Sequence, residues 1–381
     1  MLEFKLSPVS LPAYANDLRA EVRTFLEEEL TAITPAARAK SWFGCDPDFS
    51  RKLGARGWIG LTWPKQYGGH ERPAIDRYII IEEMLAASAP VGAHWIADRQ
   101  SGPLLLNFGS DAAKAAFLPK IAKGELYFCI GMSEPNAGSD LAAIETIATR
   151  TDGGWIVNGS KLWTTNIDDA DLMIALVRTH KATDNRHDGM SQLIIDLTAS
   201  GVTRRAIENH QSEKHFGEVF FENVFVADDM VVGRPGQGWM QVNAELALER
   251  SGPERYLSSY RLYEELVLSH QNSPDAIIEN LVGELTARLW TLRQMSLSVS
   301  KHVGDGDNPA IEAAIVNDLG ATFEQELPPL VQAAVNQQGS ASHDALNNVM
   351  DYLLLFSPVF SLRGGTREIL RGIIAREIGL R

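Results

Sequence analysis

The spacing of hydrophobic residues is helical over the first part of the chain. From about residue 17, Leu18, Val22, Phe25 and Leu26 recur at helical spacing, and Thr34 followed by proline is a stop signal. Similar spacing predicts further helices over residues 49–56, 75–87, 91–100 and 111–123. Between them, residues 57–69 combine aromatic residues, glycines and a proline, which predicts a packed loop. Residues 1–125 are therefore predicted to form an α-helical domain.

The pattern changes to short alternating runs between residues 126 and 235. Alternation over 171–178, 192–197 and 218–226 predicts strands, with turn residues between them. Asn158 followed by Gly159 is a strong hairpin signal. This middle block is therefore predicted to be an antiparallel β domain.

Helical spacing returns from residue 236 onward. Helices are predicted over 240–265, 274–303, 309–336 and 344–355, which suggests a four-helix bundle over 236–381. Pro253 cannot donate to the carbonyl of Glu249, so that turn of the first helix is predicted to be broken or kinked, and Pro328 with Pro329 must interrupt the third helix. The predicted fold class is a multidomain α+β protein: N-terminal helices, a middle β domain and a C-terminal bundle.

Composition and charge limit the function classes. A chain of 381 residues can bury two or three cores, and its net charge of −14 opposes non-specific nucleic-acid binding. No uninterrupted apolar run approaches the ~20 residues of a membrane span. Cys45 and Cys129 are the two cysteines, and the first residues lack a basic stretch followed by an apolar core. We expect a cytoplasmic protein without a membrane or nucleic-acid partner.

Two segments of the β block carry candidate chemistry. Residues 129–140 end an apolar run in a loop rich in Pro, Gly, Ser and Asn, which leaves hydroxyls and backbone N–H groups free to bind a ligand. Residues 155–166 end with the indole of Trp163 beside the hydroxyls of Thr164 and Thr165. An aromatic plane beside short donors suits a flat, polar heterocycle. The alternative is that Trp163 is a core aromatic and that the hydroxyls only cap turns.

Other signals for a ligand are few. Gly364 and Gly365 precede the last predicted helix, where they would let backbone approach a ligand. The sequence contains no Walker loop, no GxSxG elbow and no zinc spacing, so no metal site is predicted.

Three separated segments together resemble the acyl-CoA dehydrogenase family. Residues 133–140 (SEPNAGSD) are close to its T/S-E-P-x-A-G-S-D signature, and residues 158–166 (NGSKLWTTN) are similar to its N-G-x-K-x-W-I/T-T/S-N segment. Residues 364–371 (GGTREILR) resemble its G-T-S-E-I-Q-R ending. The resemblance covers nearly the whole chain and agrees with the predicted order of helices, β domain and bundle.

The resemblance implies an FAD site between the β domain and the bundle. Ser133, with Met132 beside it, would bond the pyrimidine edge of the isoalloxazine, Trp163 would lie against the ring, and Thr165 would approach N5. Charge on the reduced flavin develops near N1 and O2, where fixed donors lower the barrier. Further along the chain, Thr366 and Glu368 match positions near the sugar and phosphates of the dinucleotide. For Thr366 and Glu368 the alternative is ordinary helix capping.

The same resemblance implies a catalytic base that removes the α-proton of an acyl-CoA while hydride leaves the β-carbon. In many relatives this glutamate stands just before the terminal Gly-Thr, where this chain has Gly364. A subgroup similar to isovaleryl-CoA and long-chain enzymes places it in an L-x-L-E-R pattern, which residues 246–250 (LALER) match. Glu249 is therefore the predicted base, with Arg250 beside the substrate. The alternative is a solvated carboxylate paired with Arg250 or Arg255.

Substrate contacts are implied at three more positions. Ser139 matches the family position close to the CoA arm. Trp95 and Arg99 lie four apart on a predicted helix and so share a face; in the family this helix lines the acyl cavity. The tryptophan would shorten the pocket, and the arginine would receive a polar or carboxylated acyl group. The alternative is that Trp95 is core and Arg99 pairs with a surface acid.

Two family elements are absent from the sequence. Residues 268–279 lack the R-x-x-F-G element that meets the flavin pyrophosphate across a subunit boundary, and residues 337–340 (QQGS) do not reproduce the Q-x-x-G-G segment that approaches the adenine. The leading expectation is a homotetramer or homodimer that makes a 2,3-enoyl-CoA and passes electrons to an electron-transfer flavoprotein. The alternatives are an enoyl-CoA reductase of the same fold, or a non-catalytic partner subunit of a hetero-oligomer.

Overall fold

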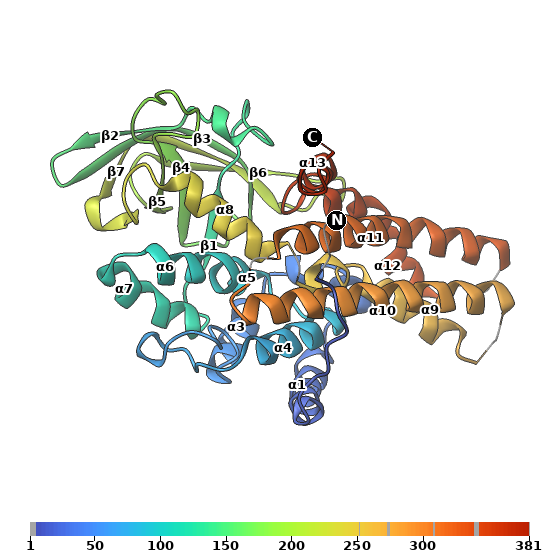
Figure 1. The fold of residues 1–381 in the computed structure, drawn as a ribbon. Helices are drawn as coiled ribbons and strands as arrows, with labels where there is room; N and C mark the ends of the chain where they lie inside the picture. Colours follow the sequence, from blue (N-terminus) through green and yellow to red (C-terminus); the bar gives the residue numbers. More distant parts are fainter. Residues whose placement is uncertain (1–4, 251, 273–274, 308, 339–342, 381) are drawn as a thin grey trace. The chain divides into compact units, whose positions relative to one another are not determined.

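The chain folds into two compact units, each assembled from separate stretches of sequence. The computed structural model describes residues 5–250, 252–272, 275–307, 309–338 and 343–380, with backbone only for 245–249 and 338. One unit, here called the helical unit, comprises Met1–Gly44, Arg72–Pro90 and Arg250–Arg381. The other, here called the sheet unit, comprises Cys45–Glu71 and Val91–Glu249. The predicted order of helices, sheet and helices is confirmed (Figure 1).

The helical unit combines N-terminal and C-terminal helices. They are α1 (Ala15–Leu30), α2 (Pro35–Arg38), the 3₁₀ turn η1 (Ser41–Phe43), α4 (Ala74–Ala86), η6 (Pro253–Arg255), α9 (Tyr260–His270), α10 (Ala276–Gly304), α11 (Ala310–Gln338), α12 (Asp344–Phe356), η7 (Ser357–Leu362) and α13 (Arg367–Glu377). Helix α1 buries the predicted stripe of Leu18, Val22, Phe25 and Leu26. Arg19 of α1 and Arg293 of α10 both pair with the buried Glu82 of α4. Buried apolar faces and arginine–glutamate ion pairs therefore hold these helices together.

The sheet unit carries helices of its own. They are α3 (Pro47–Ala55), η2 (Lys65–Tyr67), α5 (Gly92–Ile96), the π turn η3 (Ala97–Ser101), α6 (Gly102–Phe108), α7 (Asp111–Ala122) and α8 (Gly238–Glu249). The predicted helix over 91–100 therefore continues through a π turn into α6. Residues 57–69 form the predicted packed loop, because Trp58, Leu61 and Trp63 are buried there.

The sheet has eight strands in the order β6-β7-β3-β2-β4-β5-β8, with β1 beside β4. Their bounds are β1 (Phe128–Gly131), β2 (Ile147–Thr151), β3 (Gly154–Thr165), β4 (Leu172–Arg178), β5 (Met190–Asp196), β6 (Val202–Ile207), β7 (Phe216–Ala227) and β8 (Val231–Val232). Short 3₁₀ turns, η4 (Leu141–Ala143) and η5 (Asp228–Met230), join some of them. Most pairs are antiparallel as predicted, but β4 pairs in parallel with both β1 and β2.

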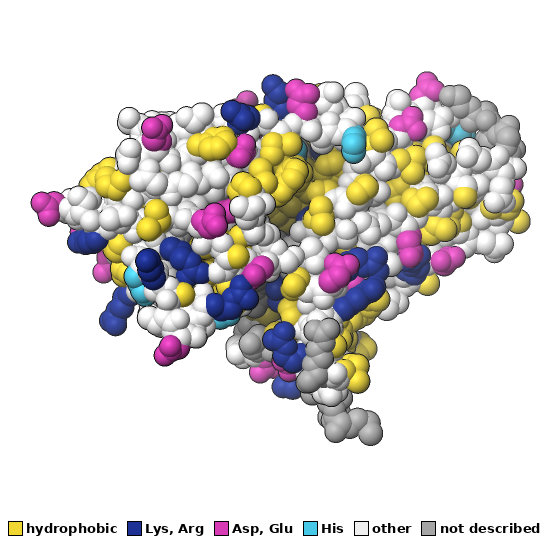
Figure 2. Space-filling model, turned by 90° about the horizontal axis from the view of Figure 1, so that it is seen from above, with side chains coloured by type: hydrophobic (Ala, Val, Ile, Leu, Met, Phe, Trp, Pro, Cys, Tyr) yellow, Lys and Arg dark blue, Asp and Glu magenta, His cyan; other side chains and the backbone are white. Residues whose placement is uncertain are grey.

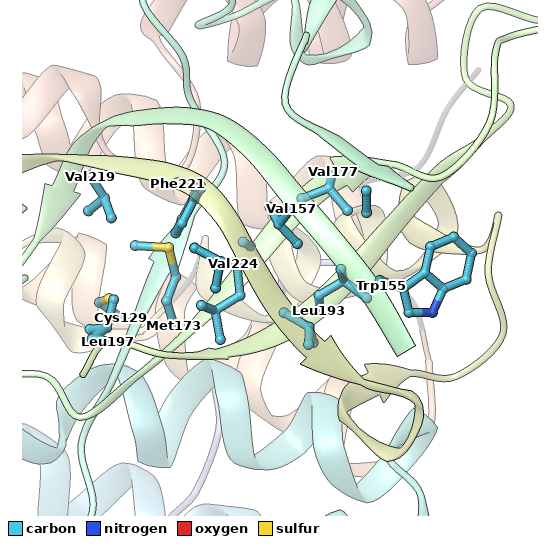
Figure 3. Close-up of a cluster of buried hydrophobic side chains, with 14 of the residues drawn as sticks. Cys129, Trp155, Val157, Met173, Val177, Leu193, Leu197, Val219, Phe221 and Val224 are labelled. Carbon is cyan, nitrogen blue, oxygen red and sulfur yellow. The ribbon is translucent and has the colours of Figure 1, made fainter. Parts of the chain in front are cut away.

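A hydrophobic core lies against one face of this sheet. Side chains from several strands converge on it, including Cys129, Trp155, Met173, Leu193 and Phe221 (Figure 3). Each strand buries alternate residues here because successive side chains point to opposite faces. Cys129 belongs to this core, and burial raises the pKa of its thiol far above the ordinary value, so it packs as a small hydrophobe.

The hairpin predicted at Asn158 and Gly159 is wrong. Both residues lie inside β3, and the chain instead reverses between β2 and β3, where Gly153 has a φ of +73°. The pairing of β3 with β7 shifts register between Val157 and Gly159, so the Asn-Gly pair marks a β-bulge. A Cβ at Gly159 would lie 2.6 Å from Oγ1 of Thr146, so the close approach there requires glycine.

The three prolines predicted to interrupt helices behave differently. The break before Pro253 is confirmed, because α8 ends at Glu249 and η6 begins at Pro253. The interruption predicted at Pro328 and Pro329 is wrong, since α11 runs through both. Leu327 and Val331 on either side are fully buried, and this packing outweighs the missing hydrogen bonds.

One described stretch, Asp344–Glu377, is long and apolar enough to cross a membrane by length and composition alone. It comprises α12, η7 and α13, and it buries Leu346, Val349, Leu353 and Phe360. Core helices of this kind meet the same length and composition criteria, so the stretch is weak evidence for a span.

Candidate functional site

The loop that follows β1 carries the first group of predicted site residues. It folds back on itself, since the N–H of Glu134 donates to the carbonyl of Ala137 (2.9 Å) and the N–H of Ala137 donates back (3.1 Å). Met132 and Ser133 are partly buried, whereas Ser139 is exposed. The carbonyl of Ser133 accepts from the N–H of Leu162 in β3 (2.9 Å). The loop is therefore attached to the strand that carries the second group.

The end of β3 presents Trp163 to solvent. Its side chain is 58% exposed, and its backbone is left-handed with a φ of +61°. The pairing with β7 shifts register between Lys161 and Thr164, which turns the indole outward. The ring meets Phe216 edge to face at a centroid distance of 6.3 Å. The alternative that Trp163 is a core aromatic is therefore wrong.

The residues after Trp163 hold the strand end in place. Thr164 is buried and Thr165 is partly buried. Asn166, also left-handed at φ +54°, donates from Nδ2 to the carbonyl of Gly92 (3.1 Å) and from its N–H to the carbonyl of His215 (3.0 Å). Backbone strain of this kind costs about 1–3 kcal/mol per residue and clusters at binding sites. The indole of Trp163 is thus presented by a fixed, strained strand end, on which Thr165 is partly buried.

A buried ion pair connects the two groups, and the sequence analysis missed it. Nζ of Lys161 lies 2.7 Å from Oε1 of Glu134 and 3.2 Å from the carbonyl oxygen of Met132. Burial lowers the pKa of Lys161 to about 8, against the opposing effect of Glu134. Burial opposes ionisation of Glu134 as well, but Lys161 and the N–H of Glu145 outweigh it and lower that pKa. The sequence does contain a signal for this ion pair, because Glu134 lies within residues 133–140 and Lys161 within residues 158–166, the two segments that resemble the family.

Trp95 and Arg99 share a face, as predicted from their spacing. Cζ of Arg99 lies 4.7 Å from the centroid of the Trp95 ring, and both side chains are buried. Arg99 belongs to the π turn after α5 and lines a small cavity with Leu104 and Phe108 of α6 and Ala244 of α8. Single-turn π bulges often mark functional sites. The arginine therefore borders a cavity inside the sheet unit rather than the surface.

The predicted C-terminal site residues belong to the helical unit. Thr366 caps α13, accepting at Oγ1 from the N–H of Ile369. Glu368 is exposed in the first turn, where its own backbone N–H and the Thr366 hydroxyl lower its pKa. The capping alternative is thus observed for Thr366, and the role of both residues at a dinucleotide stays a prediction.

Gly364 occupies a position where a side chain would be strained. Its φ is +65°, and an added Cβ would lie 2.9 Å from Nδ2 of Asn317 and 3.2 Å from Nη2 of Arg255. Its carbonyl accepts from Nε of Arg250 (3.0 Å). Gly364 therefore has no side chain that could act as a base, and any other residue there would be strained and would displace the ends of Asn317 and Arg255.

Glu249 is the last residue of α8, and the boundary between the two units falls directly after it. Its side chain lies outside the described residues, so its role as a base stays a prediction. Part of the 337–340 segment also lies outside them. Within the residues that are described, no group of three or more His, Cys, Asp or Glu could hold a metal ion.

Together these residues suit a planar, hydrogen-bonding cofactor. The fit rests on the exposed, strained indole of Trp163, with the partly buried hydroxyl of Thr165 on the same strand end. The loop of Ser133 is bonded to that strand through Leu162 and Lys161. A large exposed aromatic beside fixed polar groups suits an isoalloxazine ring, which is flat and carries polar atoms at its edge.

The sequence matches two family models. Residues 13–125 match the acyl-CoA dehydrogenase N-terminal domain, and residues 129–224 match the acyl-CoA dehydrogenase middle domain. A curated relative, the acyl-CoA dehydrogenase IpdE1 of Mycobacterium tuberculosis, is 30% identical over 95% of this chain and 97% of its own length.

Solved structures share the fold. A structure described as the Tcur3481-Tcur3483 steroid ACAD matches with a TM-score of 0.87 at 24% identity, covering 97% of this chain and 98% of that one. The ChsE4-ChsE5 complex from Mycobacterium tuberculosis matches with a TM-score of 0.83 at 27% identity, covering 98% and 100%. With the matched family models and the IpdE1 relative, the chain belongs to the acyl-CoA dehydrogenase family, whose members are FAD-dependent oxidoreductases.

Proposed function

We propose that this chain catalyses the FAD-dependent α,β-dehydrogenation of an acyl-CoA thioester to a 2,3-enoyl-CoA. The observation that carries the proposal is the outward-facing Trp163 in left-handed backbone, on a strand end bonded to the loop of Ser133. Bound FAD would supply the hydride acceptor. The protein's part is to hold the ring, exclude water and remove a proton.

The residues divide into cofactor and substrate contacts. Trp163 would hold the flat face of the ring, while Ser133, Met132 and Thr165 would supply polar atoms at its edges. In the helical unit, Thr366 and Glu368 would face the sugar and phosphates. Ser139 and Arg250 would meet the CoA thioester, since Ser139 is exposed in the loop after β1 and Arg250 directly follows α8.

Glu249 would be the base that takes the α-proton. A carboxylate acts best as a base when partial burial raises its pKa toward the working pH. The proposal is supported by Gly364, since the alternative family position of the base carries no side chain here and has the left-handed backbone that favours glycine. It is also supported by the helix break after Glu249, which ends α8 at the carboxylate.

The acyl group would be compact and polar rather than long and straight. Arg99 is buried against the Trp95 ring and lines the cavity between α6 and α8. A guanidinium there would receive a polar or carboxylated acyl group, and the indole would limit the length of the pocket. One structural relative is described as a steroid ACAD, so steroid-derived acyl groups belong in the trial set.

The experiment combines flavin binding with one substitution. The purified protein should be yellow or become so with added FAD, and substrate should bleach the flavin absorption. In Glu249→Gln the flavin should remain bound and the bleaching should be lost. Glu279→Gln, an exposed carboxylate in the first turn of α10, is the matched control and should bleach normally.

Three outcomes would contradict parts of the proposal. Full bleaching in Glu249→Gln would remove Glu249 from the mechanism. In a panel of acyl-CoAs, fastest turnover of long unbranched chains would refute the proposed acyl pocket. Reduction of an enoyl-CoA instead of oxidation of the saturated substrate would favour the enoyl-CoA reductase alternative. The electron partner distinguishes the two activities, because the dehydrogenase requires an electron-transfer flavoprotein as acceptor.

A non-catalytic partner subunit is the second candidate, because two structural relatives are described under paired protein names, one of them explicitly as a complex. The helical unit exposes hydrophobic side chains that a second subunit would cover, in a homodimer, a homotetramer or a hetero-oligomer. They are Leu319, Leu355, Leu362, Ile369 and Leu380. Figure 2 shows hydrophobic side chains at the surface of the C-terminal helices. A preparation that stays colourless with added FAD would favour this candidate.

A further inference from the structure

Lys161 crosses the sheet unit inside its core rather than reaching solvent. Its side chain is 0% exposed, and its stem passes over Gly131 at the end of β1. A Cβ on Gly131 would lie 3.0 Å from Cγ of Lys161 and 2.6 Å from Sδ of Met173. The missing side chain of Gly131 therefore makes the passage through which the lysine runs from β3 to the loop after β1.

The ammonium group of Lys161 lies where three backbone segments meet. It donates to Oε1 of Glu134 and to the carbonyl oxygen of Met132. The same carboxylate accepts from the N–H groups of Glu145 (2.6 Å) and Thr146 (3.1 Å), just before β2. One ion pair thus fixes the loop, the start of β2 and the strand that ends in Trp163.

Stability alone does not account for a charge at this position. Removing two charges from water costs several kcal/mol, and well-packed apolar residues often replace such pairs without loss. An apolar pair here would leave the Glu145 and Thr146 N–H groups and the Met132 carbonyl without these side-chain partners. Glu134 keeps the ammonium charged at neutral pH although burial lowers its pKa to about 8. The pair therefore orders polar backbone beside the proposed site.

We propose that Lys161 is a positioning residue for the flavin site, setting the spacing between the Met132–Ser133 peptide and the strand end that carries Trp163 and Thr165. The inference rests on the proposed function. The ammonium also polarises the peptide whose carbonyl it bonds, because hydrogen bonds in a chain strengthen one another. The N–H of Ser133, on the other end of that peptide, becomes a stronger donor toward an electron-rich heterocycle.

The test compares Lys161→Met, which keeps the stem and removes the charge, with Glu134→Gln, which keeps acceptor oxygen and removes the charge. Apoprotein is titrated with FAD, and flavin absorption, reduction potential and amide hydrogen exchange are recorded. We expect Lys161→Met to weaken FAD binding at least about tenfold, a loss typical of supporting residues. Its flavin absorption should shift, its reduction potential should fall, and amide exchange should quicken at residues 133–134, 136–137 and 145–146. Glu134→Gln should change the same quantities less.

Glu82→Gln is the matched control, since Glu82 is a buried carboxylate bonded to Arg19 and Arg293 in the helical unit. It should lower the midpoint of unfolding without changing the flavin absorption. Equal flavin changes in this control and in Lys161→Met would overturn the inference, because they would reflect general destabilisation.

Unchanged FAD affinity, absorption and loop exchange in folded Lys161→Met would also overturn it. If that variant does not fold, Glu134→Gln decides by the same measurements. Failure of the unmodified apoprotein to bind FAD would instead remove the proposed function, and the inference with it.

Discussion

Two tryptophans of the sheet unit play opposite parts. Trp63, in the packed loop over residues 57–69, is 3% exposed, whereas Trp163 at the end of β3 is 58% exposed. Backbone packs closely on the Trp63 ring. A Cβ added at Gly60 would lie 2.7 Å from that ring, and a Cβ added at Gly102 would lie 2.1 Å from it. Around Trp163 the tryptophan itself occupies the left-handed backbone that glycine adopts most easily.

The difference shows which aromatic is structural and which is available. Glycines near Trp63 remove side chains so that backbone can pack on the indole, which stabilises the fold. At Trp163 backbone strain and a register shift turn the indole outward, which contributes nothing to a core. The fold maintains backbone strain at Trp163 and thereby exposes a large apolar side chain. Such strain and exposure together indicate a binding site.

The largest expected effect is at Trp63. Trp63→Ala should lower the free energy of unfolding by about 3–5 kcal/mol, because it leaves a cavity in a rigidly packed site. Urea unfolding monitored by circular dichroism measures this loss. Trp63→Phe, which keeps most of the volume, should lose clearly less. A loss below about 1 kcal/mol for Trp63→Ala would mean that the loop collapses around the gap, so that the packing around Trp63 is not rigid.

The next effect concerns the pH dependence that Lys161 imposes near Trp163. Its pKa is lowered from 10.5 to about 8 on folding, so the unfolded chain binds more protons between these values. Its contribution to stability therefore increases as the pH rises through that window, by roughly 1–3 kcal/mol. Among its described contacts, Glu134 is the titratable partner.

FAD affinity should move in the opposite direction to stability. Above pH 8 the neutral amine bonds Met132 and Glu134 more weakly, so FAD binding should weaken while the fold does not. Both pH effects should vanish in Lys161→Met, as urea unfolding and FAD titration from pH 7 to 10 would reveal. If Lys161→Met showed the same pH profiles as the unmodified protein, Lys161 would be excluded as the source of both pH effects.

The smallest effect on stability is expected at Trp163. Trp163→Gly relieves the left-handed strain but gives up the contact with Phe216, so the free energy of unfolding should change by no more than about 1 kcal/mol. FAD affinity should nevertheless fall. Thermal unfolding with and without FAD separates the two quantities. A large loss of stability with unchanged FAD affinity would reverse the roles assigned to the two tryptophans.

Local signals in the sequence were sufficient for much of the fold and part of the site. The stripe of α1, the packed loop over residues 57–69 and the break before Pro253 follow from spacing, aromatic content and a missing N–H. The loop of Ser133 and the strand end of Thr165 were likewise marked by their residue types. The hairpin at Asn158 was predicted wrongly because the same dipeptide also suits a β-bulge, and only the pairing with β7 distinguishes them.

The sequence by itself determined the family, the order of helices and strands, and the chemical groups available to bind and react, because these depend on residue types and short spacings. Only the tertiary structure decided that Trp163 faces outward, that Gly364 lies in left-handed backbone against Asn317 and Arg255, and that Lys161 joins Glu134 from 27 residues away. Exposure, steric room and long-range ion pairs depend on which segments pack together, and hydrophobic periodicity carries no information about that choice.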